Sequence, residues 1–234
     1  MLKNILLLLL LCPFATATAQ VGFANTFNGR VISVADINGQ SLIGTQYKGN
    51  IEGTPFLTEQ WLDVMVQLKN GAAIPAKVKL NIESNELYYM DSIKKIRIAD
   101  DGLVKRIDFI NAASDEKLKY PLKSGYPPAD NLKANLFFQV LAEGKMELLC
   151  RNYKLIETFK NEASGEIRKE FIEKNKYYLY YGETLRAYNF QKEQVLQLMM
   201  DKEVEINDYL QANKINFKKI PDIQKLVAYY NRIK

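Results

Sequence analysis

Histidine is absent from this 234-residue sequence, and its absence excludes several classes of site. Histidine is the commonest general base in enzymes and a usual zinc ligand, and it completes the Ser-His-Asp arrangement of many hydrolases. The sequence also contains no GxGxxG or GxxxxGK[ST] run, so the usual phosphate-binding loops are missing. We therefore expect no enzyme activity, no catalytic residue, no cofactor and no metal site.

Long hydrophobic runs are also absent, and the short apolar run near the N-terminus has the pattern of a leader that is cleaved on export. Lys3 precedes the apolar residues 5–11, and small residues surround Ala19. The run is shorter than the roughly 20 apolar residues that a permanent membrane anchor needs. The pattern predicts a signal peptide over residues 1–19, an exported protein in the periplasm or outside the cell, and no transmembrane anchor after cleavage. Cys12 leaves a lipoprotein as the alternative.

Cysteine is scarce, because Cys150 is the only one beyond this leader. No disulfide can then form within the mature chain, which must rely on its apolar core. We expect Cys150 to be a buried small apolar residue within the run 146–150. The net charge is only +5, with lysines and acids interspersed, which predicts neither a nucleic-acid partner nor an anionic membrane surface.

What the sequence does contain is a repeated β-hairpin pattern. Residues 78–82 alternate between apolar and polar, residues 83–86 supply a turn, and residues 87–90 form an aromatic-rich run, which predicts one hairpin. Similar pairs of segments occur at 63–68 with the turn Asn70-Gly71, at 93–98 and 104–109 around 100–102, at 135–141 and 145–150, and at 177–181 and 184–188. Because the turn at 100–102 is short, the strands on either side of it are expected to pair antiparallel.

The apolar period changes to that of helices near residue 189. Asn189 is a candidate N-cap for the first helix, a second helix begins near Asp201, and Pro221 opens a third. The third helix carries a one-sided apolar stripe of Ile223, Leu226, Val227 and Tyr230. Such a stripe needs a covering surface, so we expect the helices to pack on one face or one end of the sheet.

The predicted fold class is therefore α+β: an antiparallel β-hairpin meander, as a curved sheet or open barrel, with C-terminal helices. The expected organisation is a signal peptide at 1–19, an N-terminal segment at 20–52, a β domain at 53–190 and helices at 191–234. The segment 20–52 is rich in glycine and asparagine, and is either a loosely ordered lead-in or an edge hairpin around Asn38-Gly39.

Aromatic residues supply the candidate partner-binding positions, which are Trp61, Tyr88, Tyr89, Tyr178 and Tyr180. Adjacent tyrosines in a strand point to opposite faces of the sheet, so one of each pair is expected in the core and the other partly exposed. An exposed aromatic ring offers a large contact area to a sugar ring or a protein at low entropic cost. Core packing is the simpler explanation for each of these residues.

Carboxylates are the remaining groups for acid–base chemistry. Asp100, Asp101 and Asp108 form one cluster in the sequence, but a glycosidase needs two carboxyl groups at a defined separation, which the sequence does not give. Aspartate followed by glycine at 100–102 is typical of a tight turn, and we interpret it so.

Several of these segments together resemble a known family. Gly53-Thr54-Pro55-Phe56-Leu57, then Trp61, Asn70-Gly71, Leu80-Asn81 and Leu87-Tyr88-Tyr89, are followed by the hairpin at 138–145 and by the closing Ile220-Pro221-Asp222-Ile223 and Tyr229-Tyr230-Asn231. This order of motifs, over roughly residue 53 to the C-terminus, resembles a family of exported, uncharacterised envelope proteins of Bacteroidota. The resemblance implies an envelope location and no catalytic residue.

Two functional hypotheses follow. In the first, a non-catalytic envelope protein binds a protein or glycan partner by exposed aromatic residues or by pairing an edge strand. In the second, a curved sheet encloses an apolar cavity and carries a lipid-like ligand. A filled interior favours the first and an open apolar concave face favours the second. A hydrolase that uses carboxylates alone would require a buried pair at glycosidase separation.

Overall fold

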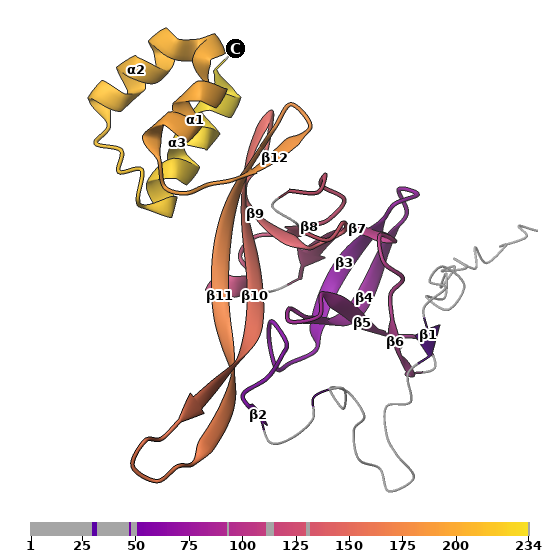
Figure 1. The fold of residues 1–234 in the computed structure, drawn as a ribbon. Helices are drawn as coiled ribbons and strands as arrows, with labels where there is room; N and C mark the ends of the chain where they lie inside the picture. The colour runs from indigo at the N-terminus through magenta and orange to yellow at the C-terminus, as the bar shows by residue number, and fades with distance from the viewer. Residues whose placement is uncertain are drawn as a thin grey trace, which may run out of the picture.

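The computed structural model describes residues 30–31, 47, 51–92, 94–110, 115–129 and 132–233. The expected signal peptide at 1–19 and the turn at Asn38-Gly39 lie outside the described residues. Within the described residues, the fold is mostly sheet, with three α-helices at the C-terminal end (Figure 1). The expected hairpin succession is confirmed in the main, and the α+β class fits this arrangement.

Twelve strands make up the single sheet of the described residues. They are β1 (Arg30–Val31), β2 (Ile51–Glu52), β3 (Leu62–Leu68), β4 (Ala73–Asn81), β5 (Glu86–Met90), β6 (Ile96–Ile98), β7 (Val104–Phe109), β8 (Leu122–Lys123), β9 (Phe138–Ala142), β10 (Met146–Lys160), β11 (Ile167–Tyr181) and β12 (Thr184–Ala187). Eleven follow the order β1-β6-β5-β4-β3-β7-β8-β9-β10-β11-β12, and β2 pairs parallel with β11. The other pairs are antiparallel, so β2 alone makes the sheet mixed.

The expected pairing across the turn at 100–102 is wrong. Strand β6 pairs with β5 and β1, whereas β7 pairs with β3 and β8. The amide of Ala99 donates to Leu87 at 2.9 Å, and the carbonyl of Leu103 accepts from Lys69 at 2.9 Å, so the chain crosses the strand ends from β5 to β3. In the sheet order β6 and β7 are four strand intervals apart, about 19 Å in a flat sheet, whereas four residues reach only about 13 Å, so the short connection requires the sheet to curl. Beside β3, β7 buries Ile107 completely.

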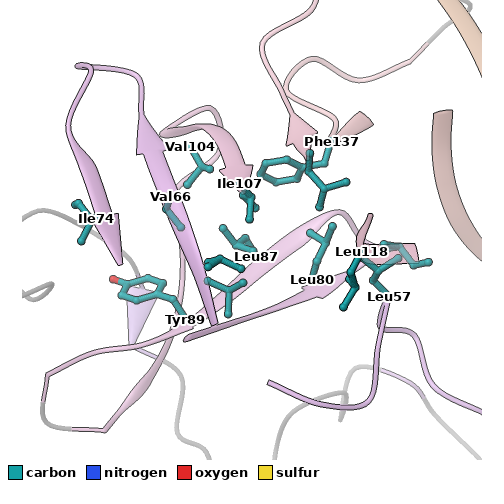
Figure 2. Packing of buried hydrophobic residues seen from close by; sticks show 14 of the residues in the cluster. Leu57, Val66, Ile74, Leu80, Leu87, Tyr89, Val104, Ile107, Leu118 and Phe137 are labelled. Carbon is teal, nitrogen blue, oxygen red and sulfur yellow. The ribbon is translucent and has the colours of Figure 1, made fainter. Parts of the chain in front are cut away.

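The first half of the sheet encloses its own core. Figure 2 shows Val66 of β3, Leu80 of β4, Leu87 of β5 and Ile107 of β7 converging on one interior, with Phe137 beside them. All are buried. The alternating positions of these strands put their apolar side chains on one face, as the sequence pattern predicts.

The sheet curls until its later strands contact its earlier ones. The amide of Lys154 in β10 donates to the carbonyl of Ile82, which directly follows β4, at 3.3 Å. The segment before β3 is attached to the same place, because Leu57 donates to Leu80 at 2.8 Å and Ile82 donates to Pro55 at 3.0 Å. Residues 54–57 therefore line the end of β4 at the place where β10 contacts it.

The C-terminal helices cover one end of the β10–β11 hairpin (Figure 1). They are α1 (Lys192–Leu198), α2 (Glu203–Ala212) and α3 (Ile220–Arg232). The expected stripe of α3, from Ile223 to Tyr230, is buried against Met146, Leu148 and Leu179 of the hairpin. The prediction that helices pack on one end of the sheet is confirmed, and the core in Figure 2 lies apart from them.

The start of α1 differs from the expectation. Its N-cap is Gln191, which makes no side-chain cap, rather than Asn189. The amide of Asn189 instead donates to the side chain of Gln194 at 2.8 Å. Gln194 is the third residue after the N-cap, as in a capping box, but its side chain reaches the amide two residues before the N-cap instead of that of Gln191.

Asn231 near the end of α3 fixes the turn between β9 and β10. Its Oδ1 accepts from the amide of Met146 at 2.9 Å, and its Nδ2 donates to the carbonyl of Met146 at 2.8 Å. Gly144 in that turn has φ +151°, and a Cβ there would lie 2.5 Å from the Asn231 side chain. The turn therefore requires glycine for the close approach of the helix.

Candidate functional site

Burial removes three of the five candidate aromatic residues. Tyr88 and Tyr89 point to opposite faces of β5, as expected, yet both are buried. The prediction that one of this pair is exposed is wrong, because Phe56 packs edge-on against Tyr88 on the second face. Tyr178 is also fully buried, where it packs edge-on against Phe138.

Trp61 and Tyr180 are the two candidates that keep exposed surface. Tyr180 packs edge-on against Tyr126, within the cluster beneath the loop that precedes β9. Trp61 packs partly against the cluster of Phe56 and Tyr88, and also lines an open depression. The two residues belong to different clusters, so the structure does not bring the five candidates together in one site.

The acidic cluster considered for hydrolysis is divided by the fold. Asp101 lies in the turn that connects β6 to β7, where Gly102 has φ +74°, which confirms the turn interpretation. Asp108 lies in β7 and accepts from the guanidinium of Arg106 at 2.9 Å. Asp108 is therefore engaged in an ion pair within β7 and lies apart from the turn that holds Asp101.

A second pair of carboxylates, Glu143 and Glu147, is bridged by Lys123. The Lys123 ammonium lies 2.6 Å from buried Glu147 and 3.4 Å from Glu143, and Arg106 binds Glu143 at 2.8 Å. Tyr126 also donates to Glu147. Partial burial raises the pKa of Glu143, but hydrogen bonds from Arg106 and Lys123 outweigh it and leave the pKa below its ordinary value. The acid of a glycosidase needs a raised pKa, so Glu143 does not suit that role. The network instead connects β7, β8 and the β9–β10 turn.

Cys150 is buried as expected. Burial raises the pKa of its thiol to about 12, so roughly one thiol in 10⁴ is ionised at pH 8.

In a chain that carries Cys12→Ser, we expect no reaction of native Cys150 with a disulfide reagent at pH 8 within an hour, and one thiol per chain in guanidinium. The neutral thiol is favoured by folding, so its contribution to stability is complete below about pH 8.5 and declines as the pH rises toward 12. Rapid labelling of the native protein would contradict this assignment.

The most prominent candidate for binding is the outer part of the β10–β11 hairpin, residues 151–176, which we call the arm. Strands β10 and β11 pair residue for residue over 15 positions, without a bulge. β9 pairs with β10 only from Leu148 to Cys150, and the last contact of β10 with the sheet body is that of Lys154. Beyond it, the arm projects from the sheet (Figure 1).

The two edges of the arm differ. β2 pairs with β11 at Lys169 and Glu170, and Tyr47 packs edge-on against Phe171. Residues 155–160 of β10, which we call the open edge, have β11 on one side and no other strand of the described residues on the other. Leu155, Ile156 and Phe159 on this edge are 44%, 38% and 39% exposed.

Comparisons with protein-family models, curated proteins and solved structures found no match. The resemblance to envelope proteins of Bacteroidota thus stays a prediction.

None of the helices in the described residues is both long and apolar enough to cross a bilayer. No group of three or more histidine, cysteine, aspartate or glutamate side chains in the described ranges is arranged to hold a metal ion.

The sequence pattern also predicts that residues 153–160 extend the strand at 145–150, as β10 does, but it misses the β11 side of the arm. On that side the pattern predicts a strand at 177–181 only, whereas β11 begins at Ile167. A signal was present in the turn-forming run at 161–165, where Asn161 accepts from the amides of Ala163 and Ser164, and Gly165 has φ +72°. That turn, placed after a strand at 153–160, would have required a returning strand.

Proposed function

We propose that this protein is a non-catalytic binding module of the cell envelope, which docks an extended segment of another polypeptide along the open edge of the arm. The observation that carries the proposal is the edge at residues 155–160, which has exposed apolar side chains and pairs with β11 alone among the strands that the structure describes. The leader expected at 1–19 supports the envelope location.

The backbone of an edge strand is the first reason. Along an edge, alternate residues present N–H and C=O groups that only another backbone satisfies in a regular row. Proteins usually protect such edges with proline, bulges or several charges. The open edge has no proline and no bulge, and one of its two charged residues, Glu157, is engaged by Lys174 across the hairpin.

The side chains are the second reason. Leu155 and Phe159 point to one face of the arm and Ile156 to the other. A partner strand added here would find an apolar contact on each face for its own alternating side chains, which is how strand addition gains specificity. A two-stranded ribbon is also marginally stable in water, and a third strand would stabilise it.

The filled interior of the first half of the sheet supports a binding module over a lipid carrier. Fifteen buried apolar residues pack there in one cluster, and the space at one end of it, beside Leu87, Val104 and Phe137, measures about 20 Å³, which is enough for one water molecule. A lipid-like ligand needs a cavity of several hundred Å³.

Site-specific photo-crosslinking in cells tests the proposal. A photoreactive residue at Thr158 on the open edge is expected to capture a polypeptide, and the same residue at Thr184 of β12 is not. Both threonines are exposed strand positions, so the pair is matched. The captured residues should lie in an extended segment of the partner.

The double variant L155K/F159K is expected to abolish the Thr158 crosslink without lowering the melting temperature, because both side chains are exposed. Equal capture from Thr158 and Thr184, or capture of lipid without polypeptide, would refute strand addition.

A further inference from the structure

A second surface, independent of the arm, lies over the first hairpins. It is an open depression of about 750 Å³ on the outer face of β3 and β4, beside the end of β5. The lining residues that matter here are Trp61, Asp63, Pro75, Lys77, Met90 and Ile110. In β3 and β4 these residues alternate with the buried core residues Val64 and Val78, so they face away from that core.

Trp61 gives the depression an aromatic wall that the fold holds in place. It directly precedes β3, and part of the side chain packs against the cluster of Phe56, Tyr88 and Ile96. Phe56 itself is held by its bridge to Asn81 and by Lys79, whose ammonium lies 4.4 Å from the ring centroid. A ring supported on one side loses little conformational entropy when a ligand contacts its remaining surface.

Two polar residues of the depression, Asp63 and Lys77, form a donor and acceptor pair without net charge. Asp63 and Lys77 are directly opposite in the β3–β4 ladder, and their side chains form an ion pair at 2.7 Å. The Asp63 side chain is 59% exposed and that of Lys77 51% exposed, so both keep capacity for further hydrogen bonds. Asp91, which also lines the depression, is already engaged by Arg97 at 2.8 Å.

We propose that this depression binds a neutral oligosaccharide. A pyranose ring presents a C–H face, which suits Trp61, and equatorial hydroxyls, which donate to the Asp63 carboxylate and accept from the Lys77 ammonium. Pro75, Met90 and Ile110 supply apolar walls for neighbouring rings. An open depression admits the middle of a chain as well as its end.

The charges argue against other occupants. An apolar side chain of a protein would remove water from the Asp63–Lys77 pair without replacing its hydrogen bonds, which costs binding free energy. The charged lining residues are two aspartates, Asp63 and Asp91, and two lysines, Lys77 and Lys94, so the depression offers no excess positive charge to an acidic sugar. A neutral, hydroxyl-rich ligand satisfies the pair and needs no such excess.

Trp61 is the only tryptophan, so its fluorescence reports on this depression alone. The full chain is titrated with maltohexaose, cellohexaose and chitohexaose, and with an acidic oligogalacturonate. At least one neutral hexasaccharide is expected to give a saturable change in intensity or wavelength, and the acidic oligosaccharide none. No change in Trp61 fluorescence with any of the three neutral sugars, or a change with the acidic oligosaccharide alone, overturns the proposal.

Variants connect the response to the named groups. D63N and K77Q are each expected to weaken binding at least ~10-fold, because each alters a charge-assisted hydrogen bond to the sugar. K105Q, at an exposed lysine of β7 that does not line the depression, is the matched control and should leave affinity unchanged. Unchanged affinity in both D63N and K77Q, or saturation by an unrelated extended peptide in place of sugar, would overturn the assignment even if Trp61 fluorescence responds.

Trp61→Phe separates stacking from folding, since phenylalanine keeps an aromatic ring against Phe56 and Tyr88. Calorimetry of this variant should show weaker sugar binding at an unchanged melting temperature. The crosslinking test at Thr158 does not involve this face, so either proposal can fail while the other stands.

Discussion

Replacing Leu226 with alanine should lower the free energy of unfolding by about 2–5 kcal/mol, because the change leaves a cavity in a close-packed cluster. Leu226 is fully buried in α3, in the cluster that includes Met146 and Leu148 of β10. The measurement is urea denaturation followed by far-UV circular dichroism, with stability taken from the midpoint and slope.

Val227 and Val204 provide a matched pair for the same experiment. Val227→Ala and Val204→Ala delete the same two methyl groups from helices, but Val227 is fully buried and Val204 is 70% exposed. Val227→Ala is expected to destabilise the protein, whereas Val204→Ala should stay within about 0.5 kcal/mol of wild type. Equal effects of the two variants would mean that α3 is not docked on the hairpin as described.

The hairpins that were predicted correctly are those specified by local chemistry. Asn70 and Gly71 fix the β3–β4 turn, in which Asn70 accepts from the amide of Ala72 at 3.0 Å and Gly71 has φ +88°. Such turns need only a few adjacent residues, so they can be read from sequence. The α3 stripe was predictable for a similar reason, since one face of the helix is buried and the other is not.

Strand order and the arm were not predictable in this way. The residues at 100–102 predict a turn, but they do not determine which strand pairs with β7. The first part of β11 has no buried face, so burial does not require alternation there, and Ile167 and Phe171 are separated by charged residues. Period-2 patterns arise from one-sided burial, and a ribbon exposed on both faces lacks them.

The candidate aromatic residues show the same limit. Alternation correctly placed Tyr88 and Tyr89 on opposite faces, yet the burial of Tyr88 depends on Phe56, which lies more than 30 residues away. Only the fold reveals which surface a distant segment covers. Trp61 was singled out by its chemistry, and the depression beside it became visible only once β3, β4 and β5 were placed together.

Lys154 connects the arm to the rest of the sheet, and its replacement should have the second-largest effect. Its buried ammonium donates to the carbonyls of Thr54 and Phe56, both at 2.8 Å. Lys154→Met keeps most of the hydrocarbon packing but leaves both carbonyls without this donor. Each unsatisfied carbonyl destabilises the folded state by about 1–3 kcal/mol. Relief of the buried charge offsets part of the loss. We therefore expect a net destabilisation of about 2–3 kcal/mol by chemical denaturation.

The matched control is Lys174→Met on the same hairpin. Lys174 pairs with Glu157 at the surface, where solvent screens the ion pair, so its replacement should be much milder than that of Lys154. If Lys154→Met were as mild as Lys174→Met, the two carbonyls would be satisfied without Lys154, and residues 54–57 would not depend on it.

The pH dependence of stability separates the hydrogen bonds that Lys154 donates from the cost of burying its charge. Burial lowers the pKa of Lys154, and the nearby Glu173 carboxylate opposes this shift only in part. The folded state therefore binds this proton less tightly than the unfolded chain, so stability from this group rises as the pH passes the folded pKa, up to about 10.4. A neutral amine keeps two hydrogens, enough for both carbonyls. The stability difference between wild type and Lys154→Met should accordingly widen between pH 7 and pH 10, and a difference that narrows over this range would assign the ammonium a stabilising charge instead.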